Sequence, residues 1–238
     1  MSEPEEASVT CGACGHSQPF TVWSSLNVTL DKELKQELLD RRLTSSTCGQ
    51  CGNTTEVVYP LLYHDMGQKL MIWLWPEPGD PDYGDTRQFR IMKGYRFRIV
   101  RTIIELVEKI LVFDQNCDDR EVELFKFLVR AQHRATPHPL DGALYFRAIR
   151  PDEQGNDVIE FLHVTEIGAQ TVDFPLREYR DAVVLLRHDF TLEEPKPGTW
   201  LRVDADFVQA PVTRASDQPT EPNNETGDPA GDDADEPF

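Results

Sequence analysis

Four cysteines are arranged in two pairs with the spacing of a metal site. Cys11 and Cys14 form the first Cys-x2-Cys pair, and Cys48 and Cys51 form the second. Two such pairs supply four thiolates, a ligand set that suits tetrahedral Zn²⁺ and leaves no coordination position for water or substrate. The spacing therefore predicts one structural zinc ion per chain.

A glycine follows the second cysteine of each pair, at Gly15 and Gly52. Glycine adopts positive φ without steric cost, so backbone N–H groups can turn toward the thiolates. Iron in the same geometry, or a thiol switch that releases zinc on oxidation, are the alternatives that the spacing leaves open. Cys117 stands alone, and we interpret it as a loop or core residue.

A basic segment with interleaved aromatic residues is the second candidate site. Its six cations occur within 15 residues that include no acid: Arg87, Arg90, Lys93, Arg96, Arg98 and Arg101. Cations beside aromatic rings are typical of surfaces that bind a nucleic-acid backbone and stack its bases. The alternative is a strand with a basic solvent face, whose Arg96 and Arg98 form ion pairs with nearby acids.

Those acids form a third candidate, an acidic surface made of Glu105, Glu108, Asp118 and Asp119. Paired carboxylates perform acid–base chemistry or bind Mg²⁺, so a carboxylate-dependent hydrolase or nuclease is one hypothesis. Helix-capping acids and a solvated helix face are the alternative. The sequence lacks the motifs of phosphate-binding loops, dinucleotide sites, nucleophile elbows and zinc-protease helices, so nothing in it recommends an enzyme.

The charge is strongly negative, at −18. Much of it comes from residues 215–238, which hold eight acids and no Lys or Arg, and which we predict to be disordered because they offer almost no apolar surface to bury. An acidic chain disfavours general phosphate binding, so we expect a protein partner rather than nucleic acid. No stretch resembles a membrane span or a signal peptide, which predicts a cytoplasmic protein.

Hydrophobic periodicity and turn residues predict an α+β fold. The expected helices cover residues 32–42, 101–113, 119–131 and 175–190, and the expected strands cover 54–63, 69–75, 95–100, 143–149, 158–164 and 200–208. This gives a zinc ribbon with an inserted helix, joined to a mixed α/β body with β-hairpins and an αα-hairpin. We predict an acidic extension at 1–8 that precedes the folded structure, a ribbon and helix-pair domain at 9–130, a C-terminal α/β part at 131–210 and a tail at 211–238. An internal boundary is possible at 76–88.

The combination of these motifs resembles the CpXC domain, a bacterial and archaeal family. The resemblance rests on the two cysteine pairs, the helix between them, the Tyr-Pro-Leu-Leu-Tyr segment at 59–63, the Glu-Lys-Ile stretch at 108–110 and the Asp-Asp-Arg stretch at 118–120. One departure is that Gly12 and Gly49 replace the proline that follows the first cysteine of each family pair. The resemblance implies zinc and this fold class, and it implies no reaction. The leading hypothesis is therefore a structural-zinc interaction module. A redox-responsive zinc-thiolate protein and the carboxylate hydrolase are its alternatives.

Overall fold

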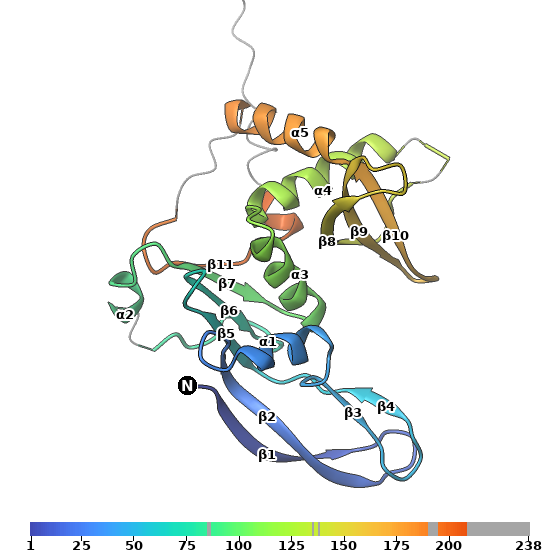
Figure 1. Ribbon diagram of the computed structural model, residues 1–238. Helices are drawn as coiled ribbons and strands as arrows, with labels where there is room; N and C mark the ends of the chain where they lie inside the picture. The colour runs from blue at the N-terminus through green and yellow to red at the C-terminus, as the bar shows by residue number, and fades with distance from the viewer. Residues whose placement is uncertain (85–86, 135, 138, 190–194, 209–238) are drawn as a thin grey trace, which may run out of the picture.

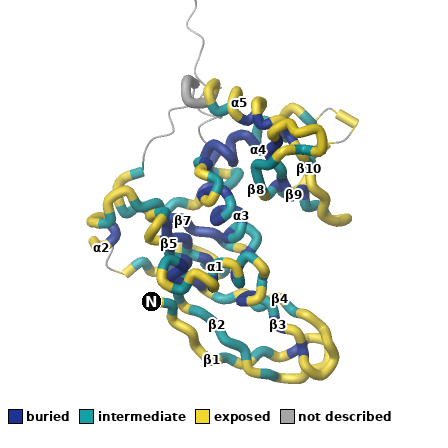
Figure 2. Tube along the Cα trace, in the orientation of Figure 1, coloured by how far each residue is buried: buried dark blue, intermediate teal, exposed yellow. Residues whose placement is uncertain are grey.

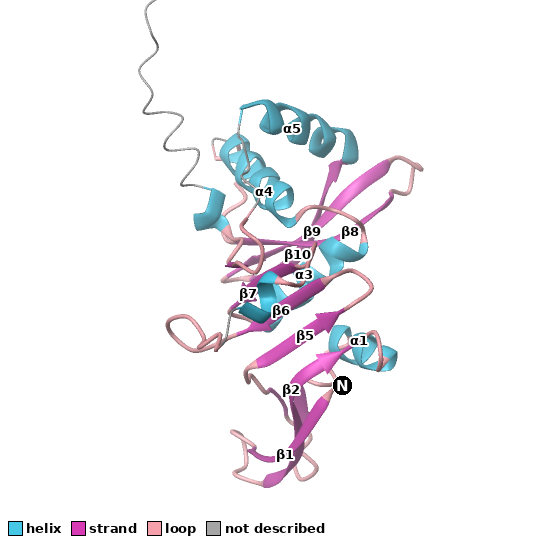
Figure 3. Ribbon diagram, turned by 90° about the vertical axis from the view of Figure 1, so that its left-hand side faces the viewer, coloured by secondary structure: helices cyan, strands magenta, loops and turns pink. Residues whose placement is uncertain are grey.

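A six-stranded sheet forms the centre of the protein. In the computed structural model, which describes residues 1–84, 87–134, 136–137, 139–189 and 195–208, its strand order is β1-β2-β5-β6-β7-β11. These strands are β1 (Glu3–Thr10), β2 (Ser17–Asn27), β5 (Leu61–Asp65), β6 (Leu70–Leu74), β7 (Arg96–Val100) and β11 (Trp200–Leu201). Figure 3 shows them side by side, with β1 at one end of the molecule.

Two helices cover one face of this sheet. They are α1 (Lys32–Leu39) and α3 (Ile103–Asp114). Their apolar faces meet alternate residues of β6, namely Leu70, Ile72 and Leu74, in one buried core. The intervening side chains of β6, Met71 and Trp73, point to the opposite face of the sheet.

Aromatic rings cover the opposite face. Met71 of β6 packs there with Phe97 of β7 and Phe89, which belongs to the short helix α2 (Arg87–Arg90). Trp200 of β11 joins this cluster, with its ring 5.1 Å from that of Phe97. The two-sided apolar pattern of residues 70–75 thus corresponds to a buried central strand.

A second, three-stranded antiparallel sheet has the order β10-β9-β8. Its strands are β8 (Ala143–Pro151), β9 (Asp157–Thr165) and β10 (Gly168–Pro175). Helices α4 (Asp119–His133) and α5 (Leu176–Asp189) pack against it, with Phe125, Phe161 and Tyr179 at the centre of their shared core. In Figure 1 this sheet and the six-stranded sheet lie on different sides of α3.

A small two-stranded sheet completes the fold at the far end of the β1–β2 hairpin. It contains β3 (Ser45–Thr47) and β4 (Thr54–Glu56), paired antiparallel. Figure 2 shows that these two hairpins are largely exposed, whereas the buried residues concentrate around α3, α4 and the middle of the central sheet. The hairpins therefore have little apolar core of their own to hold them together.

Several sequence predictions needed correction. The acidic start is not an extension that precedes the folded structure, because Glu3–Thr10 pairs with β2 along its whole length. The expected strand 54–63 is two strands in different sheets, β4 and β5. Strand β10 was missed.

The last expected strand is also wrong beyond its first residues. β11 is two residues long, and residues 205–208 are helical. The Asp204 carboxylate accepts hydrogen bonds from the backbone N–H groups of Asp206 and Phe207, both at 3.1 Å, which starts a helical turn in place of a strand.

Other expected elements are present, with shifted ends. The helix expected at 32–42 ends at Leu39, and the helix expected at 175–190 covers Leu176–Asp189. The tail expected at 211–238 lies outside the described residues, and the division into domains stays a prediction. No helix in the described part of the chain is long and apolar enough to cross a membrane.

Candidate metal centre and a buried ionic cluster

The four paired cysteines meet at the tips of two hairpins. Cys11 and Cys14 lie in the turn between β1 and β2, and Cys48 and Cys51 lie in the turn between β3 and β4. All four Sγ atoms lie within 4.8 Å of one another. The Sγ atoms of Cys11 and Cys51 are 3.6 Å apart, as are those of Cys14 and Cys48.

The two turns repeat the same backbone hydrogen bonds. Gly15 N–H donates to the Cys11 carbonyl, and Gly52 N–H donates to the Cys48 carbonyl, both at 2.9 Å. Both glycines have positive φ, at 76° and 74°. A side chain at either position would strain this conformation, so the glycines allow each turn to aim two sulfurs at one point.

Backbone N–H groups favour the ionised form of the first cysteine of each pair. The N–H groups of Cys14 and Ala13 lower the pKa of the Cys11 thiol to about 6. The N–H groups of Cys51 and Gln50 lower the pKa of Cys48. The His16 N–H acts in the same direction on Cys14, but the neighbouring sulfurs and burial outweigh it and raise the pKa of Cys14 to about 12. Four adjacent thiolates thus need a cation among them.

The sulfur spacing fits zinc. A tetrahedral ion with four bonds of about 2.3 Å separates its ligands by about 3.8 Å, close to the two 3.6 Å distances. The cluster can therefore hold a metal ion, with Cys11, Cys14, Cys48 and Cys51 as its ligands. If these four thiolates fill a tetrahedral shell, the ion has a structural role.

Gln18 of β2 joins the two hairpins beside the cysteines. Its side-chain nitrogen donates to Ser46 Oγ and to the Thr47 carbonyl, both at 2.9 Å. Its side-chain oxygen accepts from Gly49 N–H at 2.9 Å. A single amide therefore links β2 to the β3–β4 turn, and no sequence motif marks it.

The structure divides the basic segment into two sets. Arg98 is 3% exposed and binds Asp119, while Arg96 lies 4.2 Å from the centre of the Phe113 ring. Arg101 donates to the carbonyls of Trp75 and Glu77. The remaining cations, Arg87, Arg90 and Lys93, are exposed near α2. The segment therefore does not present all six cations on one surface.

The acidic candidates also serve different contacts. Glu105 accepts a hydrogen bond from Arg101 N–H at 2.7 Å. Asp118 caps α4 by accepting from Arg120 N–H, as its position in the sequence suggested. Glu108 and Asp119 are buried. They belong to a group of six charged side chains that we call the ionic cluster: Arg98, Glu108, Lys109, Asp119, Glu123 and Lys126.

Asp119 is the centre of one half of the ionic cluster. Its two oxygens accept from Arg98 Nε and Nη2, each at 2.7 Å, in a bidentate pair. Lys109 Nζ lies 3.4 Å from the same carboxylate and donates to the Val203 carbonyl at 2.7 Å. Asp119 is 0% exposed. Burial opposes its charge, but Lys109 and Arg98 outweigh burial and lower the pKa of Asp119 to about 2.

Lys126 is the centre of the other half. Its Nζ lies 2.5 Å from Glu123 and 2.9 Å from Glu108. Glu108 also accepts from the Phe146 N–H at 2.6 Å and so satisfies a backbone donor of β8, an outer strand of its sheet. Burial lowers the pKa of Lys126, but Glu108 and Glu123 outweigh it, so the net shift is upward. The cluster joins α3 and α4 to β7, β8 and the segment after β11.

The ionic cluster borders a cavity of about 320 Å³, lined in part by Glu105, Lys109, Lys126 and Tyr145. The sequence pointed to three of its six members, Arg98, Glu108 and Asp119, and the alternative of a basic strand paired Arg98 with nearby acids, as the Arg98–Asp119 contact shows. Lys109, Glu123 and Lys126 were not selected, because only the packing of α3 against α4 and β8 brings them to the acids. A lysine three residues after a glutamate on a helix was the available signal for the Glu123–Lys126 pair.

Comparison with known proteins gives a match to a protein family. Searches against curated proteins and against solved structures each gave no match. A family model described as "CpXC protein" matches residues 9–126. The matched segment contains all four paired cysteines and all six members of the ionic cluster, whereas Val203 and β8 lie outside it. Over residues 9–126, the chain belongs to the CpXC protein family.

Proposed function

We propose that this CpXC protein is a structural-zinc interaction module that presents the joined β1–β2 and β3–β4 hairpins to a protein partner. The observation that carries the proposal is the position of the four sulfurs. They occupy the tips of two exposed hairpins, where a closed four-thiolate zinc site would replace a missing apolar core. One Zn²⁺ per chain fixes the relative position of the two tips.

The charge of the chain favours a protein partner over nucleic acid. The net charge of −18 disfavours phosphate binding by the chain as a whole. Arg98 and Arg101 are engaged within the fold, which leaves the cations near α2 as a small local patch. A nucleic acid would have to bind that patch against the field of the whole molecule.

The test combines metal analysis with partner capture. Elemental analysis of protein purified without added metal or chelator should give about one zinc per chain. Capture from a lysate of the source cells should then enrich one partner on wild-type protein and lose it on Cys48→Ser. Cys117→Ala is the matched control, because Cys117 lies outside the cluster. Partner binding that survives metal loss would overturn the proposal.

Exposure of part of the cysteine cluster favours one second candidate, a redox-responsive protein. Cys14 and Cys51 are exposed, so an oxidant can reach them. Two thiols and one hydrogen peroxide would give one disulfide and two waters, with release of the zinc. Given the 3.6 Å separations, the bonds Cys11–Cys51 and Cys14–Cys48 would join the two hairpins. Zinc that stays bound under mild peroxide would rule this candidate out.

The hydrolase or nuclease alternative gains no support from the acidic candidates. Glu108 and Asp119 are occupied by cations of the same chain, and Asp118 caps a helix. Among the described residues, the cysteine cluster is the one group of three or more acids, histidines or cysteines close enough to share a metal ion.

A further inference from the structure

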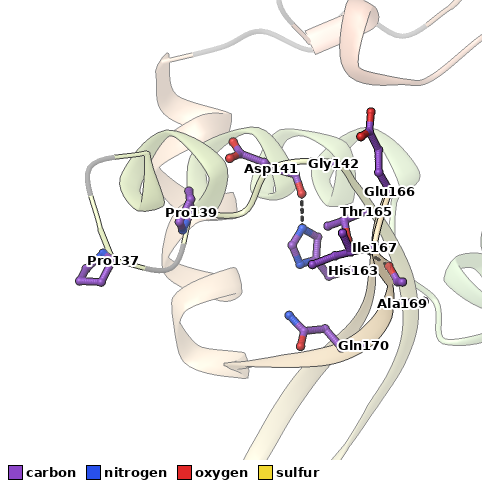
Figure 4. Close-up of a pocket in the computed structure, with 11 residues that line it drawn as sticks. Pro137, Pro139, Asp141, Gly142, His163, Thr165, Glu166, Ile167, Ala169 and Gln170 are labelled. Atoms are coloured by element: carbon purple, nitrogen blue, oxygen red, sulfur yellow. Dashed lines mark hydrogen bonds between the residues drawn. The ribbon is translucent and has the colours of Figure 1, made fainter.

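A groove of about 760 Å³ lies at one end of the three-stranded sheet, far along the chain from the cysteines. Its walls are the loop that leads into β8, with Pro139 and Asp141, and the turn from β9 to β10, with Glu166 and Ile167. Figure 4 shows these residues around the central His163. The groove is separate from the ionic cluster and its cavity.

His163 forms the floor of the groove and is 4% exposed. Its Nε2 hydrogen-bonds with the Asp141 backbone carbonyl. Because a carbonyl can only accept, Nε2 carries the proton, and Nδ1 of the neutral ring is an acceptor. Among the described residues, Nδ1 has no hydrogen-bond partner. A buried acceptor without a donor is uncommon and requires an explanation, such as an ordered water or a ligand that donates to it.

The loop that carries Asp141 is held firmly in place. Gly142 has a φ of +98°, and a Cβ at this position would lie 2.3 Å from the Val164 carbonyl oxygen. Arg130 donates to the Gly142 carbonyl at 2.7 Å. The wall of the groove is therefore fixed against β9 and is a preformed feature of the fold.

The polar groups of the groove are predominantly acceptors. Asp141 and Glu166 supply two carboxylates, and Gln170 lies beside His163, its partner in the pairing of β9 with β10. No lysine or arginine is among the described residues that line the groove. Ile167, which is 99% exposed, and Pro139 supply an apolar rim. Acceptors within an apolar rim match a cationic head on an aliphatic stem.

We propose that this groove binds a lysine or arginine side chain of a polypeptide partner. The cationic head lies near Asp141, Glu166 and the His163–Gln170 pair, while its aliphatic stem packs on Ile167 and Pro139. The negative charge of the chain draws basic segments toward it. The choice of a polypeptide over a free amine rests on the proposed function, whereas the groove itself requires neither zinc nor the hairpins.

The test uses the zinc-loaded full chain, labelled with ¹⁵N, and the probe peptide Ac-Gly-Ala-Lys-Ala-Gly-NH2. Its arginine analogue is a second probe, and the peptide with an acetylated lysine is the neutral control. We expect saturable shifts of the backbone amides around residues 139–142 and 163–170 with both basic peptides. We expect no such shifts with the acetylated peptide.

Two matched double variants locate the charge effect. Asp141→Asn with Glu166→Gln removes both groove carboxylates but keeps the Asp141 carbonyl that holds His163. Glu153→Gln with Asp157→Asn removes the same charge from exposed positions around the β8–β9 turn of the same sheet. The first variant should weaken binding about three- to fivefold, as expected for exposed ion pairs, and the second should leave it unchanged.

Absence of saturable shifts, equal shifts with the acetylated peptide, or equal loss in both variants would overturn the groove proposal. These outcomes are independent of the zinc proposal, because metal content and partner capture by the hairpins are measured separately. Conversely, protein that contains no zinc as purified and still binds the basic peptides would overturn only the function proposed for the hairpins.

Discussion

The cysteine cluster and the ionic cluster both gather ionisable side chains within a few ångströms, and they differ in how the charge is balanced. The ionic cluster contains three acids and three bases from the same chain and lies in the interior. The cysteine cluster has four potential anions at exposed hairpin tips, with no lysine or arginine among them. One region balances its charges within the chain, whereas the other can hold a metal ion from outside.

The comparison also separates local from long-range information. The cysteine ligands come from two short turns, each built by four successive residues and a glycine. The ionic cluster draws on β7, α3 and α4, and its Lys109 also donates to the Val203 carbonyl just after β11. We therefore expect the two regions to depend on different sources of stability.

Metal removal should have the largest effect. A structural zinc site contributes on the order of 10 kcal/mol of apparent binding free energy. Chelation should therefore abolish hydrogen-exchange protection in both cysteine turns and in β3 and β4. Protection of α3 and α4 should persist, because the ionic cluster needs no metal. Exposure of all regions together would show that the two are one cooperative unit.

Truncation of Asp119 should be the next largest effect. Asp119→Ala leaves Arg98 and Lys109 buried without their carboxylate, which should lower the free energy of unfolding by about 3–5 kcal/mol. Asp118→Ala is the comparison at the same helix end, since it removes a cap worth about 1 kcal/mol together with the partly exposed ion pair to Arg120. Denaturant unfolding of both variants measures the difference. Equal losses would contradict a special role for the buried carboxylate.

Acid should weaken the ionic cluster through Asp119. Its folded-state pKa of about 2 is below its ordinary value of 3.8, so its contribution is fully present above pH about 4 and is lost as the pH falls through 2. The loss should be about 2 kcal/mol. Burial raises the pKa of Glu123, so that residue contributes with the opposite sign.

Acid also protonates thiolates and releases zinc, so the pH effect must be taken as a difference. Unfolding free energies of wild type and Asp119→Asn should converge as the pH is lowered from 4 to 2. A constant difference across this range would show that the Asp119 pKa is not depressed in the folded protein.

Replacement of Gln18 should give the smallest effect. Gln18→Ala removes three hydrogen bonds between the hairpins. The loss should destabilise the joined, zinc-bound hairpins by about 1 kcal/mol, so zinc should pass to a chelator faster. The hydrogen-exchange protection of α3 and α4 should stay unchanged. Thr21→Ala, also on β2, is the control, because its hydroxyl donates to Glu6 on the neighbouring strand β1 and not to the β3–β4 hairpin. An equal rate of zinc loss in both variants would contradict a bridging role for Gln18.

The sequence by itself determined the features that depend on short segments. The cysteine pairs and their glycines, the Asp118 cap, the two-sided apolar strand at 70–74 and most of the long helices were predictable, because neighbouring residues set their geometry. The same local reasoning missed β1, since its three glutamates suggest an extension while its pairing with β2 is set by the partner strand.

Only the tertiary structure decided what the charged residues do. Six cations in one segment suggested either a common surface or a strand whose arginines pair with nearby acids. The packing of α3 and α4 decides between them, because it buries Arg98 against Asp119. Lys109 reaches Val203, which lies 94 residues further along the chain. Charge interactions act through space, so a sequence that lists every charge does not state which ones meet.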